Sequence, residues 1–269
     1  MKLKTNCLRG FVLLFLLLAS TAMVKADHSW GSYHWARSSN PFTLQLGDNL
    51  TNTTRSNWKS NFGIAIADWN KSTVLDTVAV AGGTRARRCA ITGGRVEVCN
   101  SAYGQTGWLG VAGISVTNGH ITGAYVKLND TYSMNDAEEQ LVMCQEIGHT
   151  FGLGHQDEGF YNAPLGTCMD YTQASTANQN MHPNQHDYDM LEQIYAHLDS
   201  STTIGAMAVP AQVALGDYRS PRAWGRAVRF NKEGQAILFE RDFGNGHKIF
   251  THIYPVPGSR FYNDEDHEH

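Results

Sequence analysis

One short stretch predicts the core of the fold: Cys144-Gln145-Glu146-Ile147-Gly148-His149-Thr150-Phe151-Gly152-Leu153-Gly154-His155. In a helix, Gln145 and His149 lie one turn apart on one face, so both side chains can converge on one metal ion. Glu146 sits beside them, where a carboxylate can take a proton from a water that the metal activates. Gly152 gives the backbone the freedom to end the helix sharply and return His155 to the same point.

The residues before this stretch predict how the helix begins. Asn135 with Glu138 three positions later can form a capping box, which predicts a helix over about 136–151. Upstream, the strand-like runs 111–117 and 121–128 flank Asn118-Gly119, a strong signal for a two-residue hairpin turn. The second strand of this hairpin then leads directly into the helix.

The remaining elements predict an α/β (α+β) fold with a twisted mixed sheet. A strand at 42–46, a helix at 57–70 and a strand at 74–80 suggest a right-handed crossover, and thus a partly parallel sheet. Residues 81–107 predict a hairpin cross-linked by a disulfide, with Arg85, Arg87 and Arg88 on a solvated loop. A second amphipathic helix is expected at 187–198, and alternating runs at 224–230, 236–241 and 248–254 predict a small β meander.

The amino terminus predicts export. Residues 1–26 combine a basic start, a short apolar run and small residues at their end, the pattern of a signal peptide rather than a membrane anchor. Its removal takes away four basic residues and moves the formal charge from −4 to −8, which argues against nucleic acid or an anionic membrane as partner. The expected divisions are an arm at the surface (27–40), a main domain (41–200), and a linker with a β extension and an acidic tail (201–269). A secreted monomer is expected.

Four cysteines remain after the signal peptide, an even number that suits an exported chain. We favour a bridge between Cys89 and Cys99, closing a glycine turn, and one between Cys144 and Cys168. The second would tie the metal helix to the loop that follows. Zinc ligation by these thiols is disfavoured, because their spacing fits no C-x-x-C pattern.

A second motif follows downstream, Cys168-Met169-Asp170-Tyr171. With the stretch at 145–155 it resembles the zinc motif H-E-x-x-H-x-x-G-x-x-H and the Met-turn of the metzincin metallopeptidases, over roughly residues 40–200. The resemblance implies Zn²⁺ held by His149 and His155, Glu146 as general base, Met169 as a floor under the histidines, and Tyr171 near the zinc or the oxyanion. It also implies a protein or peptide substrate, for which an edge strand within 114–128 would provide main-chain hydrogen bonds.

The chain departs from this family at Gln145, where the motif has His, and three interpretations remain open. The amide oxygen of Gln145 can be the third ligand, although it is a weaker donor for zinc than an imidazole. Alternatively His182, His186 or Tyr171 completes the site. Finally, the site can have lost its metal, which would leave an inactive exported peptide-binding module. The sequence favours a secreted zinc endopeptidase with Gln145, His149 and His155 as ligands.

Overall fold

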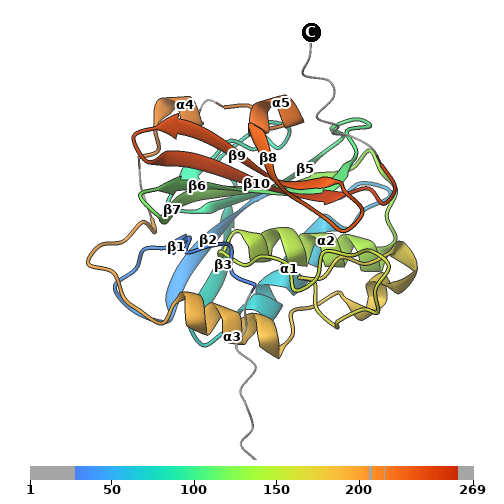
Figure 1. Ribbon diagram of the computed structural model, residues 1–269, viewed down its shortest axis with the longest axis horizontal. Helices are drawn as coiled ribbons and strands as arrows, with labels where there is room; N and C mark the ends of the chain where they lie inside the picture. The colour runs from blue at the N-terminus through green and yellow to red at the C-terminus, as the bar shows by residue number, and fades with distance from the viewer. Residues whose placement is uncertain (1–27, 206–207, 215, 260–269) are drawn as a thin grey trace, which may run out of the picture.

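The computed structural model describes residues 28–205, 208–214 and 216–259 (Figure 1). The predicted signal peptide and the acidic tail therefore lie outside the described residues. No helix in the described ranges is long and apolar enough to cross a membrane. The elements follow in the order β1 (His34–Trp35), β2 (Phe42–Asn49), α1 (Trp58–Trp69), β3 (Leu75–Ala81), β4 (Thr92–Gly93), β5 (Val96–Ser101), β6 (Trp108–Thr117), β7 (His120–Asn129), α2 (Asp136–His149), a 3-10 helix (Ala174–Gln179), α3 (Gln185–Ile194), α4 (Ala211–Ala214), α5 (Pro221–Trp224), β8 (Arg226–Phe230), β9 (Ala236–Gly244) and β10 (His247–Pro255).

A twisted mixed sheet forms the centre of the molecule, as the sequence predicts. Its strand order is β3-β2-β5-β7-β6-β10-β9-β8. The first four strands pair in parallel, and β6 and every strand after it pair antiparallel. Figure 1 shows α1, α2 and α3 beneath the sheet and the short α4 and α5 above it. The fold class is therefore mixed α+β.

The elements that lead into α2 form as predicted. Asn118 and Gly119 both have positive φ, 51° and 88°, which is the geometry of a type I′ hairpin turn. Asn135 accepts hydrogen bonds from the backbone of Ala137 and Glu138, while the Glu138 side chain accepts one from the Asn135 backbone. This capping box begins α2 at Asp136. The helix is buried from Glu139 to its end, so its whole second half packs under the sheet.

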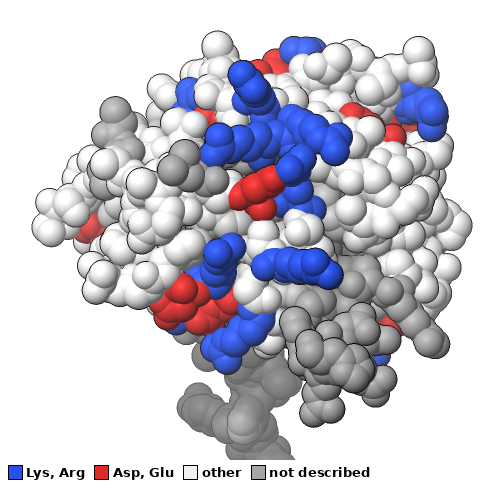
Figure 2. Space-filling model, turned by 90° about the horizontal axis from the view of Figure 1, so that it is seen from above, with Lys and Arg blue, Asp and Glu red and all other residues white. Residues whose placement is uncertain are grey.

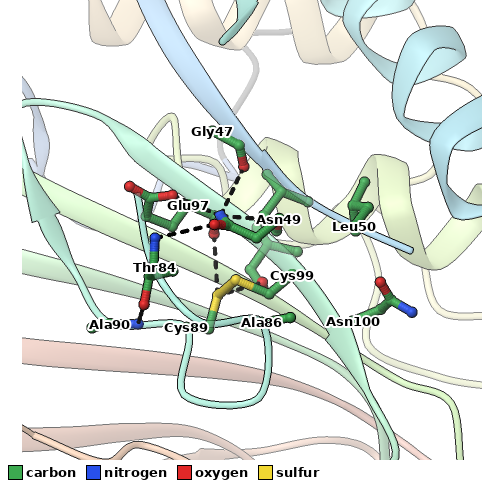
Figure 3. Close-up of a disulfide and its surroundings, with 12 residues drawn as sticks. Gly47, Asn49, Leu50, Thr84, Ala86, Cys89, Ala90, Glu97, Cys99 and Asn100 are labelled. Carbon is green, nitrogen blue, oxygen red and sulfur yellow. Dashed lines mark hydrogen bonds between the residues drawn. A yellow bond between two sulfur atoms is a disulfide. The ribbon is translucent and has the colours of Figure 1, made fainter. Parts of the chain in front are cut away.

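Residues 81–107 differ from the expected hairpin, because β4 and β5 each pair with β7 and not with each other. The predicted Cys89–Cys99 disulfide is present, beside the buried Glu97 and the half-buried Asn49 (Figure 3). Arg85, Arg87 and Arg88 line an open hollow together with Asp217 and Arg219. Figure 2 shows Lys and Arg gathering on the face seen from above, with acidic side chains among them.

The expected surface arm is instead part of the core. Trp30 and Trp35 are buried, and His34–Trp35 forms β1, which pairs in parallel with the start of β7. The backbone N–H of Trp30 donates to the carbonyl of Gly152 at 2.6 Å, so the arm runs along the turn that follows α2. The sequence interpretation missed this because the arm shows no period. Trp30 and Trp35 are nonetheless large apolar side chains that pack into the core.

The three C-terminal strands join the main sheet. β10 pairs antiparallel with β6 from His247↔Thr117 to Pro255↔Trp108, and β9 and β8 follow beyond it. The expectation of an open edge strand within 114–128 is therefore wrong. The free edge of β6 is taken by the chain's own β10, and the edges of the sheet are β3 and β8.

Candidate metal centre

The first two candidate ligands come from α2 and the turn behind it. His149 ends α2, and Gly152 follows with φ +95°, a conformation that favours glycine. A side chain on Gly152 would also collide with the carbonyl oxygen of Tyr33. This turn brings His155 back, so that His149 Nε2 and His155 Nε2 lie 3.0 Å apart. The spacing predicted this convergence.

The hydrogen bonds of these two rings leave nitrogen lone pairs facing each other. His149 Nδ1 lies 2.8 Å from the carbonyl oxygen of Leu153, so Nδ1 carries the proton and Nε2 is free to ligate. His155 Nδ1 lies 3.7 Å from a carboxylate oxygen of Glu158. Two imidazole nitrogens around a tetrahedral zinc ion are about 3.3–3.4 Å apart. The observed separation is close to that value.

A third histidine, which the sequence interpretation did not select, completes the cluster. His252 on β10 brings one ring nitrogen within 4.8 Å of a ring nitrogen of His149 and of His155, and all three residues are buried. The His252 ring stacks on His149, with ring centroids 4.0 Å apart, and meets His155 edge-on. The nitrogen lone pairs of two stacked rings point in parallel directions and do not meet at one point. The His252 ring would therefore have to turn before His149 and His252 could bind the same metal ion.

Several buried polar atoms here have no hydrogen-bond partner within the described part of the chain. They include both nitrogens of His252, Nδ1 of His155, the amide oxygen of Gln145 and both carboxylate oxygens of Glu146. The other end of the Gln145 amide is fixed, because Nε2 donates to the carbonyl oxygen of Cys168 at 2.7 Å. Unpaired buried polar atoms cost free energy unless a ligand satisfies them. A cation fits this set of nitrogen and oxygen donors.

The electrostatics of the cluster follow from burial. Loss of contact with water, and then the neighbouring His155, lowers the pKa of His149 well below its usual range. Burial, followed by His149 and His155, lowers the pKa of His252 likewise. The three rings are therefore neutral near neutral pH, which is the state that ligates metals. Burial raises the pKa of Glu146 well above its usual range, and the nearby backbone N–H of Tyr254 opposes this shift.

The two candidate catalytic groups meet at one peptide bond of β10. The Tyr171 hydroxyl donates to the carbonyl oxygen of Ile253 at 2.6 Å. Glu146 lies near the backbone N–H of the next residue, Tyr254, and its Oε1 is 2.7 Å from where a Cβ on Gly110 of β6 would stand. The Ile253–Tyr254 peptide bond thus lies between Tyr171 and Glu146. Tyr254 is opposite Gly110 in the β6–β10 register.

Met169 packs against α2 at Gly148, and its expected place as a floor under the zinc histidines stays a prediction. Its sulfur is 2.6 Å from the position that a Cβ on Gly148 would take, so the glycine leaves room for the thioether. The predicted Cys144–Cys168 disulfide is also present and joins α2 to this turn. The carbonyl of the same Cys168 holds the Gln145 amide. Helix, disulfide and turn together fix the direction of the free amide oxygen.

Of the alternative ligands named from the sequence, the two histidines lie away from the cluster and Tyr171 lies beside it. His182 Nδ1 is 2.6 Å from a carboxylate oxygen of Asp68, and the His182 side chain is half exposed. His186 stacks on His28, with ring centroids 4.8 Å apart. Tyr171 contacts the cluster through its ring, 4.1 Å from that of His155, while its hydroxyl is bonded to β10. Neither His182 nor His186 belongs to the cluster.

No protein-family model matches this sequence, and no curated protein matches it. Among solved structures, the chain is similar to myroilysin, with 14% identity and a TM-score of 0.35 over 64% of this chain and 99% of that one. It is also similar to high choriolytic enzyme 1, a hatching enzyme zinc-protease from the medaka fish Oryzias latipes, with 11% identity and a TM-score of 0.36 over 61% and 94%. These TM-scores are low, so what the site can do has to be read from its own residues.

Strand alternation holds the signal that could have found His252. On β10, Phe250 and Tyr254 belong to the core cluster around α2, whereas Ile249 and Ile253 belong to the cluster on the other side of the sheet. His252 lies between Phe250 and Tyr254 on the α2 side. A histidine on the apolar face of a strand is a candidate ligand once the strand is known to lie beside a metal helix.

Proposed function

We propose that this protein is a zinc-dependent endopeptidase whose own C-terminal strand, β10, occupies the position of a peptide substrate. One observation carries the proposal: Glu146 and Tyr171 meet at the Ile253–Tyr254 peptide bond, beside a cluster of buried histidines. Strand addition to a free sheet edge is a common way of binding an extended peptide, and β10 adds to β6 in this manner.

The donors fall into two groups. Gln145, His149 and His155 all belong to α2 and the turn behind it, which the Cys144–Cys168 disulfide holds in place. His252 belongs to β10 and would leave with that strand. We therefore assign Gln145 Oε1, His149 Nε2 and His155 Nε2 as permanent ligands, and His252 as the ligand that closes the site. A catalytic zinc site keeps one position open, and departure of His252 would supply it.

The chain's own residues have defined tasks in this reaction. A zinc ion at the site would act as a Lewis acid toward a carbonyl oxygen and make a water more acidic. Glu146 accepts the proton of the attacking water and returns it to the leaving amine, whose place the N–H of Tyr254 marks. Tyr171 donates to the carbonyl oxygen, as it does to Ile253. The backbone of β6 holds the peptide extended.

The candidate catalytic site is buried because β10 lies over it. Glu146 is fully buried and His155 is 7% exposed, so β10 has to move before another peptide can bind. Peptide and protein chains are the substrates that suit an extended sheet edge. Export remains a prediction, and the two disulfides support it because disulfides persist in oxidising compartments.

The test frees β10 without removing it. A recognition site for a specific protease is inserted at the exposed turn residue Asn245, between β9 and β10, and the zinc-loaded full chain is cut there. Hydrolysis of fluorescein-labelled casein should rise by about tenfold or more on cutting, because activity follows the open fraction. A synthetic peptide covering 247–259 should suppress it, and the same peptide with His252→Phe should suppress it less.

The matched control is the same insertion with Glu146→Gln, which should stay inactive after cutting while keeping its zinc. Circular dichroism shows whether the cut chain remains folded. A folded, zinc-loaded cut protein that leaves casein intact would overturn the proposal, as would a parent chain that takes up no zinc at this cluster. The second outcome would leave a peptide-binding module without catalysis.

A further inference from the structure

A second group of histidines lies outside the centre described above. His34 on β1 and His197 and Asp199 after α3 each bring one polar atom within 4.8 Å of the others, and His120 at the start of β7 contacts Asp199; we call these four residues the rim cluster. Asp199 Oδ1 lies 3.5 Å from His34 Nε2, 3.3 Å from His120 Nε2 and 3.7 Å from His197 Nε2. The two nitrogens His34 Nε2 and His197 Nε2 are 3.1 Å apart.

The separations among His34 Nε2, His197 Nε2 and Asp199 Oδ1 fit one small tetrahedral cation, whereas His120 Nε2 is close to Asp199 alone. Zinc with nitrogen and oxygen ligands at about 2.0–2.1 Å requires ligand atoms about 3.3–3.4 Å apart. The three separations are 3.1, 3.5 and 3.7 Å and lie on both sides of that value. The ring of His34 is nearly perpendicular to those of His120 and His197, at 89° and 85°. Perpendicular rings allow nitrogen lone pairs to converge, in contrast to the stacked pair in the buried centre.

The hydrogen bonds behind the cluster orient its donors as in a metal site. His34 Nδ1 lies 2.8 Å from the carbonyl oxygen of Ser32 and donates to it, which orients the ring so that Nε2 faces Asp199. The other oxygen of Asp199 accepts from the backbone and side chain of Arg37, at 3.2 and 3.0 Å. Oδ1 therefore faces the imidazoles.

We propose that the rim cluster is a structural zinc site with His34, His197 and Asp199 as ligands, and with His120 as the fourth once its half-exposed ring turns toward them. Imidazoles with one carboxylate are a donor set that suits zinc, and four protein ligands leave no position for chemistry. The ion would join three segments: the N-terminal arm, the sheet and the end of the helical layer. The site is reachable, because the side chains of His120 and His197 are 35% and 56% exposed.

A zinc ion in the rim cluster would also affect the N-terminal arm. Residues 28–37 follow the turn behind α2, and Trp30 packs against His252 and His149 with ring centroids 4.5 and 6.0 Å away. A zinc ion at His34 would hold this arm at its far end. The rim site thus stabilises the segment that covers the buried centre, without touching a reacting group.

The experiment counts zinc in metal-stripped full-length chain dialysed against ZnCl₂. The parent should take up two ions per chain, His197→Ala one, His155→Phe one, and the double variant none. His155→Phe keeps a ring against Tyr171 while removing both nitrogens. His182→Ala is the matched control and should keep two ions, because the His182 side chain is 48% exposed, against 56% for His197, but pairs with a single aspartate. In the His155→Phe background, zinc should raise the melting temperature, and adding His197→Ala should abolish that shift.

The outcomes separate this site from the proposed catalytic one. A His197→Ala protein that still binds as many ions as the parent would overturn the rim site. So would a double variant that keeps the ion of His155→Phe, or a His155→Phe chain that binds none. If instead the parent binds one ion, and only His197→Ala loses it, the rim site stands and the buried zinc centre fails.

Discussion

The buried cluster at α2 and the rim cluster at β1 both bring imidazole nitrogens about 3 Å apart, at 3.0 and 3.1 Å, but their surroundings differ. The buried cluster offers three histidines and an amide oxygen, all neutral, and excludes water. The rim cluster includes the carboxylate of Asp199 and reaches solvent at His197. Neutral donors leave a bound dication its full charge, which favours Lewis-acid chemistry, whereas a carboxylate neutralises part of it.

The residues beside each cluster also fit a catalytic role for the buried cluster and a structural role for the rim cluster. Beside the buried histidines lie Glu146, without a hydrogen-bond partner among the described residues, and the hydroxyl of Tyr171. Beside the rim histidines lies Arg37, which is buried and bonds Asp199 together with backbone carbonyls at the end of α3. An unpaired carboxylate next to a metal is available for proton transfer. An arginine that fastens a ligand and two loop carbonyls is a structural anchor.

The largest expected effect is a loss of casein hydrolysis that depends on the buried cluster and not on the rim cluster. In the chain cut between β9 and β10, Glu146→Gln should lower casein hydrolysis by about 10²–10⁴-fold, the usual contribution of a general base. It should leave two zinc ions per chain. His197→Ala should remove one ion and reduce hydrolysis far less. Equal losses of activity in the two variants would contradict the division between the clusters.

The two disulfides offer the next test, since only one of them touches a cluster. Replacing Cys144 and Cys168 together by alanine should lower the free energy of unfolding by about 2–5 kcal/mol, as for native bridges in small secreted domains. It should also weaken zinc at the buried centre, because the Cys168 carbonyl fixes Gln145. The matched pair is Cys89 and Cys99, with the same Cα–Cα distance of 5.9 Å.

Removing Cys89 and Cys99 should cost stability but leave both zinc sites filled. Urea unfolding, with zinc counted on the same samples, distinguishes the two pairs. A zinc content that falls equally in both double variants would mean that the Cys144–Cys168 bridge acts only through general stability.

Short sequence patterns correctly predicted those elements whose structure depends on residues close together in the chain. The capping box at Asn135, the turn at Asn118-Gly119 and the return of His155 around Gly152 depend on residues within a few positions of each other. Helix periodicity also placed Gln145 beside His149. In each case short-range backbone geometry sets the structure, so spacing along the chain was enough.

The residues that were missed come together only through long-range pairing. His252 lies in a run that the sequence predicts as a strand, but strand alternation does not say which strand lies beside it. The partner of β10 is β6, more than a hundred residues earlier, and this pairing fills the edge expected to be open. His34, His120 and Asp199 are likewise far apart in sequence and share no spacing motif. Only the folded sheet shows that His252 joins the buried cluster and that the rim residues meet.

The smallest expected effect is the share of a single buried histidine in the pH dependence of stability. Burial lowers the pKa values of His149, His155 and His252 in the folded chain, whereas in the unfolded chain a histidine titrates near about 6.5. As the pH falls through that range, the unfolded chain takes up protons that the folded one does not. Stability of the metal-free protein should therefore fall between about pH 7.5 and 5.5, by at most about 1.4 kcal/mol per pH unit for each ring.

The variant that isolates this effect is His252→Phe, which removes one titrating ring from the buried cluster and keeps an aromatic side chain against Trp30. Urea unfolding in EDTA at the two pH values should show a smaller loss of stability in this variant than in the parent. Thr251→Val is the control: Thr251 is buried on the same strand, but its hydroxyl bonds Tyr125 on the other side of the sheet. Its pH dependence should match the parent's. If His252→Phe lost as much stability between the two pH values as the parent does, water would reach His252 in the folded state. The proposal that β10 closes the buried centre would then be wrong.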